Sequence, residues 1–302
     1  MDRRSFIAKG LTAFTACYGL NALLSTPAFS MLATQHSKNK NKMGIQLYSI
    51  HEPLAEDFNG SLEKLSKMGY TYAEAYGYNG NSFLNRSLKE LQGILNDLGM
   101  EMKGTHCGTG ILPADTQAKE WDYWRKSSYD MKNAGGDYLV QSYLPAKTTV
   151  DEVKLLAEQF NKAGKLCKEN HIMFGYHNHS SDLKEIDGIR ILDILLQNTD
   201  PDLVFFQIDL GHTLNGGGNI MSYISKYPKR FKSWHASDFK IGQGYTELGQ
   251  GDVDYNELFE AAQTSGLEYL VVEQEITPDD IFKSCSRDFD FLKKYKWTKE
   301  VN

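Results

Sequence analysis

Residues 204–212 read VFFQIDLGH, an apolar run that ends in the polar side chains of Asp209 and His212. The run is too short for a typical helix and too apolar for a strand with one face in water. It therefore predicts a strand buried on both faces, as in parallel sheets. The apolar run before it along the chain, residues 173–179, reads MFGYHNH and also ends in polar residues.

The same pattern recurs along the chain, with amphipathic stretches between the apolar runs. Glycines follow several of these stretches, as helix C-terminal caps do. Eight strand–helix units in about 250 residues predict a single-domain α/β protein, a (β/α)8 TIM barrel over residues 43–296. An open doubly wound sheet is the alternative, but no Gly-x-Gly-x-x-Gly turn follows the first strand. The predicted strands are Gly44–Tyr48, Tyr72–Tyr76, Met102–His106, Tyr138–Gln141, Met173–His177, Val204–Asp209, Phe231–Ala236 and Tyr269–Glu273.

The first 42 of the 302 residues have a different character. Arg3 and Arg4 precede an apolar, small-residue stretch, which predicts a twin-arginine-like signal peptide over residues 1–30. A polar spacer over residues 31–42 follows it. We therefore expect an exported, periplasmic protein. Anchoring at the membrane, as a lipoprotein or through the N-terminal stretch, is the alternative, and we expect no membrane span in the mature chain.

Composition limits the other function classes. The net charge of −6 and the lack of clustered Lys and Arg argue against a nucleic-acid partner. Of the four cysteines, Cys17 lies in the predicted signal. The other three form no Cys-x-x-Cys pair, so neither a disulfide framework nor a zinc ribbon is expected.

Four successive predicted strands carry a histidine or a carboxylate at the same end, where barrel enzymes build their active sites. Because side chains alternate along a strand, His177, Asp209, His235 and Glu273 can converge on one point. A single histidine at a strand end is more often a structural residue, but four residues in register favour a shared metal site. Two imidazoles and two carboxylates suit Mn, Co, Zn or Fe(II) better than Ca²⁺.

The remaining strand ends add polar groups of the kind that bind polyols. We predict substrate contacts from five residues, with Glu74 alternatively a buried carboxylate satisfied by backbone donors. For a catalytic base the candidates are Glu273, His106 and His179, and the sequence does not rank them. The predicted substrate contacts are Gln46, Tyr48, Glu74, Gln141 and His212.

Several of these stretches together resemble the sugar phosphate isomerase/epimerase group of xylose-isomerase-like TIM barrels. They are GIQLYS at 44–49, YAE at 72–74, FGYHNH at 174–179, TDPDLV at 199–204, ELGQGDVD at 247–254 and VVEQ at 271–274. The resemblance implies a divalent metal held by Glu, Asp, His and Glu, and it implies that the two glutamates exchange the proton in epimerisation. Asp209, His235 and Glu273 match this pattern, whereas His177 stands where many relatives have glutamate.

The resemblance predicts a metal-dependent sugar isomerase or epimerase that removes the proton next to the carbonyl of a keto sugar. The Tyr-His-x-His pattern at 176–179 is similar to inosose dehydratase, which implies β-elimination as an alternative. Relatives that cleave 3-keto-glycosides by elimination are a further precedent. A sugar-binding barrel without turnover is the rival from another class. We expect a small sugar-like partner, and a homo-oligomer is compatible with the sequence.

Overall fold

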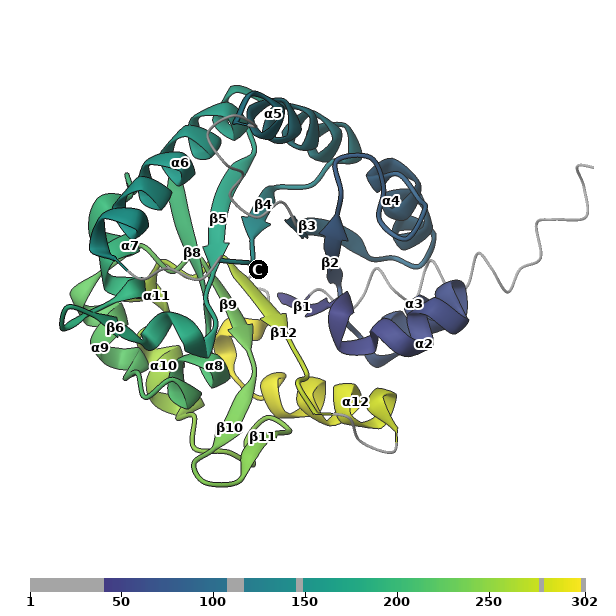
Figure 1. The fold of residues 1–302 in the computed structure, drawn as a ribbon. Coiled ribbons are helices and arrows are strands. Elements are labelled where there is room, and N and C mark those ends of the chain that lie inside the picture. The colour runs from purple at the N-terminus through teal and green to yellow at the C-terminus, as the bar shows by residue number, and fades with distance from the viewer. Residues whose placement is uncertain (1–40, 108–116, 145–148, 277–279, 300–302) are drawn as a thin grey trace, which may run out of the picture. The chain divides into compact units, whose positions relative to one another are not determined.

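The computed structural model describes residues 41–107, 117–144, 149–276 and 280–299. Residues 40–302 form one compact unit, whose strands close into an eight-stranded parallel barrel (Figure 1). The predicted (β/α)8 fold is confirmed. The predicted signal peptide and most of the predicted spacer lie outside the described residues. The barrel strands are β1 (Met43–Gln46), β2 (Tyr72–Tyr78), β3 (Glu101–Cys107), β4 (Tyr138–Gln141), β5 (Met173–His177), β8 (Val204–Asp209), β9 (Ser233–Ala236) and β12 (Tyr269–Val272).

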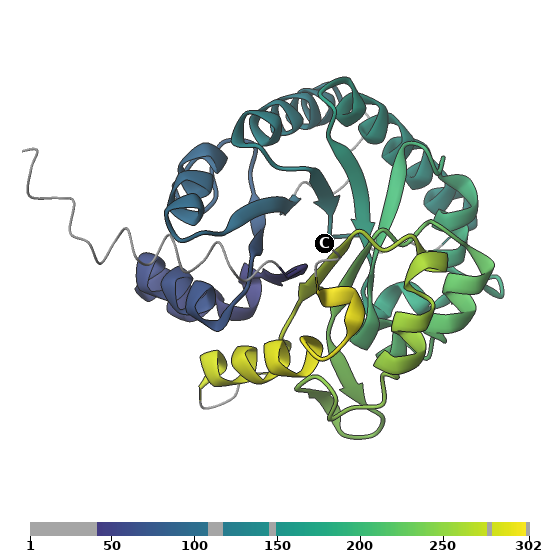
Figure 2. The same cartoon turned by 180° about the vertical axis from the view of Figure 1, so that it is seen from behind.

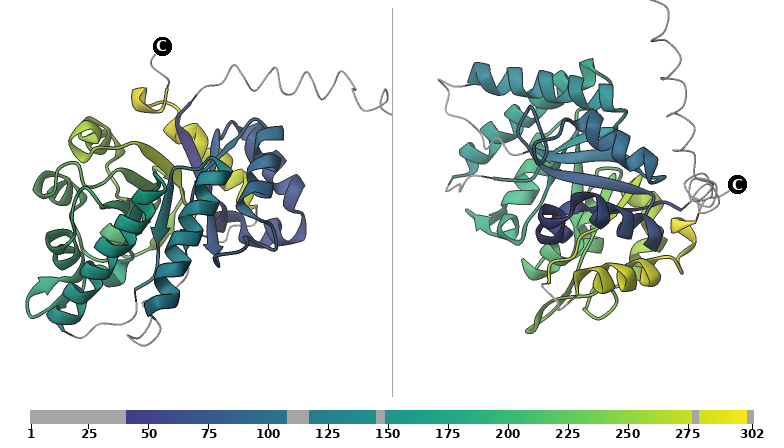
Figure 3. Two further views of the ribbon diagram at one scale, coloured as in Figure 1. Left: turned by 90° about the horizontal axis from the view of Figure 1, so that it is seen from above. Right: turned by 90° about the vertical axis from the view of Figure 1, so that its right-hand side faces the viewer.

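Helices surround the barrel on its outer side, as the front and back views show (Figures 1 and 2). The side views in Figure 3 show these helices flanking the strands. Among the described residues, no helix is long and apolar enough to cross a membrane. The helices are α2 (His51–Glu56), α3 (Phe58–Met68), α4 (Leu88–Asp97), α5 (Gln117–Ala134), α6 (Val150–Glu169), α7 (Ile191–Asn198), α8 (Leu210–Asn215), α9 (Ile220–Lys226), α10 (Tyr255–Glu260), α11 (Ala262–Ser265) and α12 (Ile281–Leu292).

Several boundaries differ from the sequence prediction: β2 and β3 extend to Tyr78 and Cys107, β9 begins at Ser233 rather than Phe231, and β12 ends at Val272 rather than Glu273. The first strand ends at Gln46 rather than Tyr48, because the Gln46 side chain accepts a hydrogen bond from the backbone N–H of Tyr48 and caps the 3-10 helix η1 (Leu47–Ile50). The segment between η1 and β2 forms two helices, because the Asp57 side chain accepts a hydrogen bond from the Gly60 N–H and caps α3. In the predicted spacer, Asn41 forms an isolated β-bridge with Lys299.

Glycines allow aromatic side chains to cross the barrel interior. Tyr72 on β2 passes over Gly44 of β1, where a Cβ atom would lie 2.0 Å from the ring. Its hydroxyl donates to the carbonyl of Leu270 on β12 at 2.7 Å and so ties together both neighbours of the first strand. Tyr138 on β4 passes over Gly104 of β3 in the same way.

The barrel interior is a separate core from the strand–helix layer. Tyr138, Val140 and Phe205 form a cluster of their own, with Met173 and Tyr269 packed against it. Phe205 fits because Gly175 on the neighbouring strand has no side chain. This aromatic layer fills the barrel below the strand ends, so polar side chains nearer those ends rest on a packed floor.

Two short hairpins interrupt the strand–helix order. They are β6 (Glu185–Ile186) with β7 (Ile189–Arg190), and β10 (Asp238–Lys240) with β11 (Gly244–Thr246). Asp238, which is buried, accepts hydrogen bonds from the backbone N–H groups of Phe239, Gly249, Gly251 and Val253. One carboxylate therefore organises the loop that follows β9.

Replacement of Gly104 by alanine tests the packing of the floor. A Cβ at this position would lie 2.1 Å from the Tyr138 ring, so we expect Gly104→Ala to destabilise the fold by about 1–3 kcal/mol, as overpacking does. The control is Gly93→Ala in the exposed part of α4, where no atom lies within 4 Å of the added Cβ. That change should stabilise the fold by roughly 0.5–1 kcal/mol. Urea unfolding measures the stability change of each variant. If the two variants changed the free energy of unfolding by the same amount, the packing described would be contradicted.

Candidate metal centre

The four residues predicted to bind a metal lie together at the carboxyl ends of four adjacent strands. His177 ends β5, Asp209 ends β8, His235 lies on β9 and Glu273 follows β12 directly. All four side chains are buried, and one potential ligand atom from each lies within 4.8 Å of the others. Such spacing is compatible with one shared cation between two imidazoles and two carboxylates.

Two polar atoms in this cluster have no hydrogen-bond partner. Asp209 Oδ1 accepts from the His212 N–H at 2.6 Å and from Ser237 Oγ at 2.7 Å, but Asp209 Oδ2 has no partner. His177 Nδ1 is also unpartnered, in a side chain that is 2% exposed. An unsatisfied buried polar group costs about 1–3 kcal/mol. Asp209 Oδ2 is thus a charged oxygen left free for a cation, and His177 has no hydrogen bond that would compete with a metal, so the donor set fits the metal that the sequence predicts.

His235 lies between two carboxylates. Its Nδ1 is 2.6 Å from Glu273 Oε2, and its Nε2 is 2.8 Å from Glu74 Oε1. Burial alone would lower the pKa of His235, but the charges of Glu273 and Glu74 outweigh burial and hold that pKa well above its usual value. Burial would raise the pKa of Glu273, but the neighbouring His235 outweighs burial and lowers that pKa. A cation at Nδ1 would take the place of the proton there.

Glu74 lies inside the barrel, fully buried, and receives hydrogen bonds from side chains rather than from the backbone. Burial would raise its pKa, but the neighbouring His106 and His235 hold that pKa well below the usual value. The carboxylate is therefore charged. Its donors are Gln46, His106, Tyr138, Gln207 and His235.

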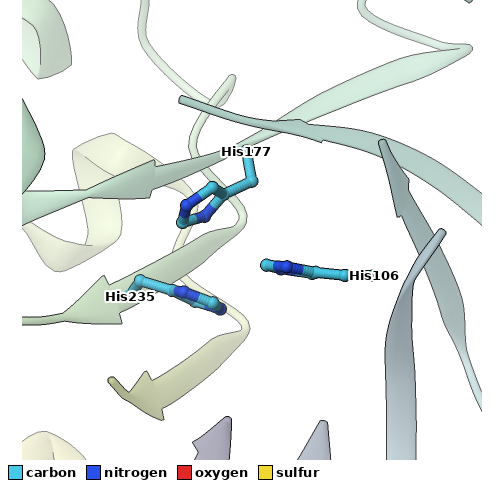
Figure 4. A group of neighbouring side chains, drawn as sticks. All are labelled: His106, His177 and His235. Carbon is cyan, nitrogen blue, oxygen red and sulfur yellow. The ribbon is translucent and has the colours of Figure 1, made fainter. Parts of the chain in front are cut away.

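Three imidazoles meet in this part of the barrel. Figure 4 shows the rings of His106, His177 and His235 turned toward one another from β3, β5 and β9. The His106 ring stacks on the His235 ring, with centroids 5.1 Å apart and planes 12° apart. Burial, followed by the charges of neighbouring histidines, lowers the pKa of His177 well below its usual value. His177 is thus neutral, as a metal-binding imidazole must be.

A second group of side chains extends from the cluster toward solvent. His179 and His212 lie with ring centroids 4.9 Å apart, and His212 Nε2 is 3.2 Å from Glu275 Oε1. Tyr245 of β11 contacts His212 Nδ1 through its hydroxyl. Burial lowers the pKa of His179 to about 4, whereas the nearby carboxylates Asp209 and Glu275 overcome burial and raise that of His212 to about 9.

The other predicted substrate contacts lie in different surroundings. Gln46 is fully buried and donates to Glu74 at 2.6 Å. Gln141 is 2% exposed and donates to the carbonyl of Tyr143. Tyr48 is 50% exposed and stacks on His51. Of these three, only Tyr48 offers a large accessible surface.

Comparison with known proteins fits this geometry. Residues 62–295 match the family described as xylose isomerase-like TIM barrel. The chain belongs to this family. Its curated relatives include inosose dehydratases from Clostridium perfringens, 30% identical over 147 residues, and from Clostridium tetani, 31% identical over 150 residues. These matches cover 42% and 43% of the chain, and the chain spans about half (49%) of the length of each relative.

Solved structures of this barrel family extend the comparison. A sugar phosphate isomerase/epimerase from Parabacteroides distasonis is 28% identical, with a TM-score of 0.77, covering 86% of this chain and 96% of that one. An IolI protein with a bound zinc atom has a TM-score of 0.67 at 16% identity, covering 84% of this chain and 99% of that one. At that identity the likeness to IolI shows the fold alone.

In this family member, a network on the outer side fixes the chain next to Glu273. Gln274 donates to Asp288 Oδ2 on α12 at 2.7 Å, and the Leu248 N–H donates to Asp288 Oδ1 at 2.8 Å. Burial raises the pKa of Asp288 to about 7, although these two hydrogen bonds oppose the rise. Asp288 thus links the loop after β11 to the residue that follows Glu273.

The raised pKa of Asp288 predicts a pH dependence of stability. An unfolded aspartate has a pKa of about 3.9, so the folded chain holds this proton more tightly than the unfolded chain does. The stabilisation is complete below about pH 4 and is lost as the pH rises through about 7. Relative to the parent, Asp288→Asn should therefore gain roughly 1–3 kcal/mol between about pH 5 and about pH 8. Urea unfolding of both proteins at both pH values measures this gain. The same difference in the free energy of unfolding at the two pH values would contradict it.

Proposed function

We propose that this protein is a divalent-metal-dependent enzyme that removes the proton next to the carbonyl of a keto sugar or keto polyol, and that loss of a β-substituent follows. The observation that carries the proposal is the buried cluster of His177, Asp209, His235 and Glu273, with two of its polar atoms unpartnered. A bound divalent ion supplies Lewis-acid polarisation of the substrate carbonyl.

The residues of the chain divide into holding and reacting roles. His177, Asp209, His235 and Glu273 would hold the ion. Ser237 and the N–H of His212 fix one oxygen of Asp209 and leave the other for the ion. Glu273, His106 and His179 are the three candidates for the base that accepts the α-proton, because each lies in or beside the cluster. The loss of activity in single variants at each of these three positions would rank them.

Elimination is favoured over isomerisation by two observations. The curated relatives reported above are dehydratases, although they match only half of their length. In addition, His177 stands where many relatives have one of the two glutamates that the resemblance implies for proton exchange, and this weakens the case for epimerisation. Isomerisation or epimerisation is the second candidate, supported by the likeness to the Parabacteroides distasonis protein over 86% of this chain.

The expected export of the protein bears on the substrate. Phosphorylated sugars belong mainly to the cytosol, and the predicted twin-arginine-like signal argues for a substrate met outside it. We therefore propose an unphosphorylated keto compound, such as an inosose or a 3-keto-glycoside.

Metal analysis tests the proposed cation. We expect the purified protein to retain about one divalent ion per chain. Asp209→Asn should weaken ion binding by more than the roughly 10- to 100-fold that loss of an outer contact costs. Asp193→Asn on α7 is the control, because its carboxylate bonds Tyr223, Lys226 and Tyr227 on the outside of the barrel. A parent protein without stoichiometric metal, and unchanged sugar binding by Asp209→Asn, would instead indicate a binding barrel.

Incubation in D₂O distinguishes the two reactions. The parent protein with Mn²⁺ or Co²⁺ is given an inosose or a 3-keto-glycoside, and the products are followed by NMR and mass spectrometry. We expect release of water or of the aglycone. Exchange of the α-proton for deuterium without release would support the isomerase or epimerase, and release without any metal would contradict the metal-dependent mechanism.

A further inference from the structure

Five side chains from five different strands converge on one buried carboxylate. Glu74 Oε1 lies 2.6 Å from Gln46 Nε2, 2.9 Å from His106 Nε2 and 2.8 Å from His235 Nε2. A further two donors reach Glu74 Oε2, Tyr138 through its hydroxyl at 2.6 Å and Gln207 through its amide at 2.8 Å. The carboxylate is fully buried and its acceptor sites are taken, so it has none left for a substrate.

We propose that Glu74 is a positioning residue that keeps a proton on Nε2 of His106 and of His235 and thereby leaves Nδ1 of His235 as the nitrogen that serves the candidate metal centre. This inference rests on the proposed function for the identity of the ion. It replaces the substrate contact predicted for Glu74 from the sequence.

The hydrogen-bond directions follow from the carboxylate, which can only accept. Gln207 must present its amide NH₂ to Glu74 Oε2 and to Ser233 Oγ, so its carbonyl oxygen faces the other way. That oxygen lies 2.7 Å from His106 Nε2. His106 Nε2 is therefore next to two oxygens that can only accept, Gln207 Oε1 and Glu74 Oε1, and it must carry the proton.

The same reasoning applies to His235. Both of its nitrogens face carboxylate oxygens and carry protons when no ion is bound, but Glu74 Oε1 lies on the side away from the cluster and keeps the proton on Nε2. Nδ1 is therefore the nitrogen that can give up its proton to a cation. The two ring nitrogens of an imidazole point in nearly opposite directions. Nδ1 of His235 accordingly faces Glu273 Oε2, at 2.6 Å, inside the four-residue cluster.

The parallel stacking of the two rings follows from their common anchor. His106 and His235 both reach Glu74 Oε1 and lie with planes 12° apart. His106 is the more accessible of the two, at 7% exposed against 0%. Because Nε2 of His106 carries the proton, its Nδ1 is the nitrogen that can accept a hydrogen bond or a proton.

Glu74→Gln tests the inference with little change in volume. The glutamine amide would place an NH₂ donor against side chains that already donate, so at least one imidazole must move its proton or turn. We expect the affinity for Zn²⁺, measured by competition with a chromophoric chelator, to fall by roughly 10- to 100-fold. The absorption spectrum of the Co²⁺ form should change as well. Asp193→Asn, a carboxylate with three side-chain donors outside the barrel, should leave both readouts unchanged.

A second measurement needs no variant and covers the case in which Glu74→Gln fails to fold. Proton–nitrogen correlation spectra of the parent protein labelled at histidine nitrogen report which nitrogen carries the proton. We expect protonated Nε2 for His106 and His235, with Nδ1 of His235 shifted on addition of Zn²⁺. A proton on Nδ1 with a bare Nε2 at either ring would overturn the inference.

The outcomes separate this inference from the proposed function. If the parent protein binds no divalent ion, the proposed function fails, while the spectra still decide the protonation of both rings. If the parent binds the ion and a folded Glu74→Gln protein binds it within about threefold, which is below the range expected for an outer contact, the inference alone fails.

Discussion

A charged carboxylate inside a barrel is the constraint on which the rest of this site depends. Removing such a group from water costs several kcal/mol unless charges and hydrogen bonds replace the lost solvent. Glu74 meets that requirement with five donor side chains, one from each of five strands, and two of these side chains are imidazoles. Each donor must hold its position, so the carboxylate orients the side chains that surround it. The packed aromatic floor and the strand-end cluster are connected through this one group.

The inward-facing residues form layers, and the layers explain how the floor supports the site. Phe205, Gln207 and Asp209 lie on one side of β8, two residues apart, in order toward the carboxyl end. Ser233 stands below His235 in the same way on β9. On these two strands an apolar ring occupies the lowest position, the neutral polar groups Gln207 and Ser233 lie above it, and the candidate ligands Asp209 and His235 lie at the top.

The fold and the four-residue cluster could be predicted from the sequence for a simple reason. Buried parallel strands leave apolar runs, and the polar residues that end them fall in register because every strand points the same way. The alternation that placed Asp209 could also have placed Gln207 beneath it, since residues two apart share a face. That signal was missed because Gln207 and Ser233 lie within otherwise apolar strands.

Other contacts leave no such pattern. Tyr245 reaches His212 from a hairpin between two barrel elements, and the hairpin geometry depends on Asp238 and four backbone N–H groups. The early end of β1 depends on a side-chain cap by Gln46. Neither hydrophobic period nor composition encodes contacts of this kind, because they form between segments that are distant or irregular.

One cation held by His177, Asp209, His235 and Glu273 is the central feature proposed for this site. The most direct test is a crystal structure of the protein soaked with Zn²⁺, with anomalous data collected on both sides of the zinc absorption edge. We predict one anomalous peak between these four side chains, within bonding distance of Asp209 Oδ2. A peak elsewhere, or an ordered cluster with water at its centre under saturating Zn²⁺, would contradict it.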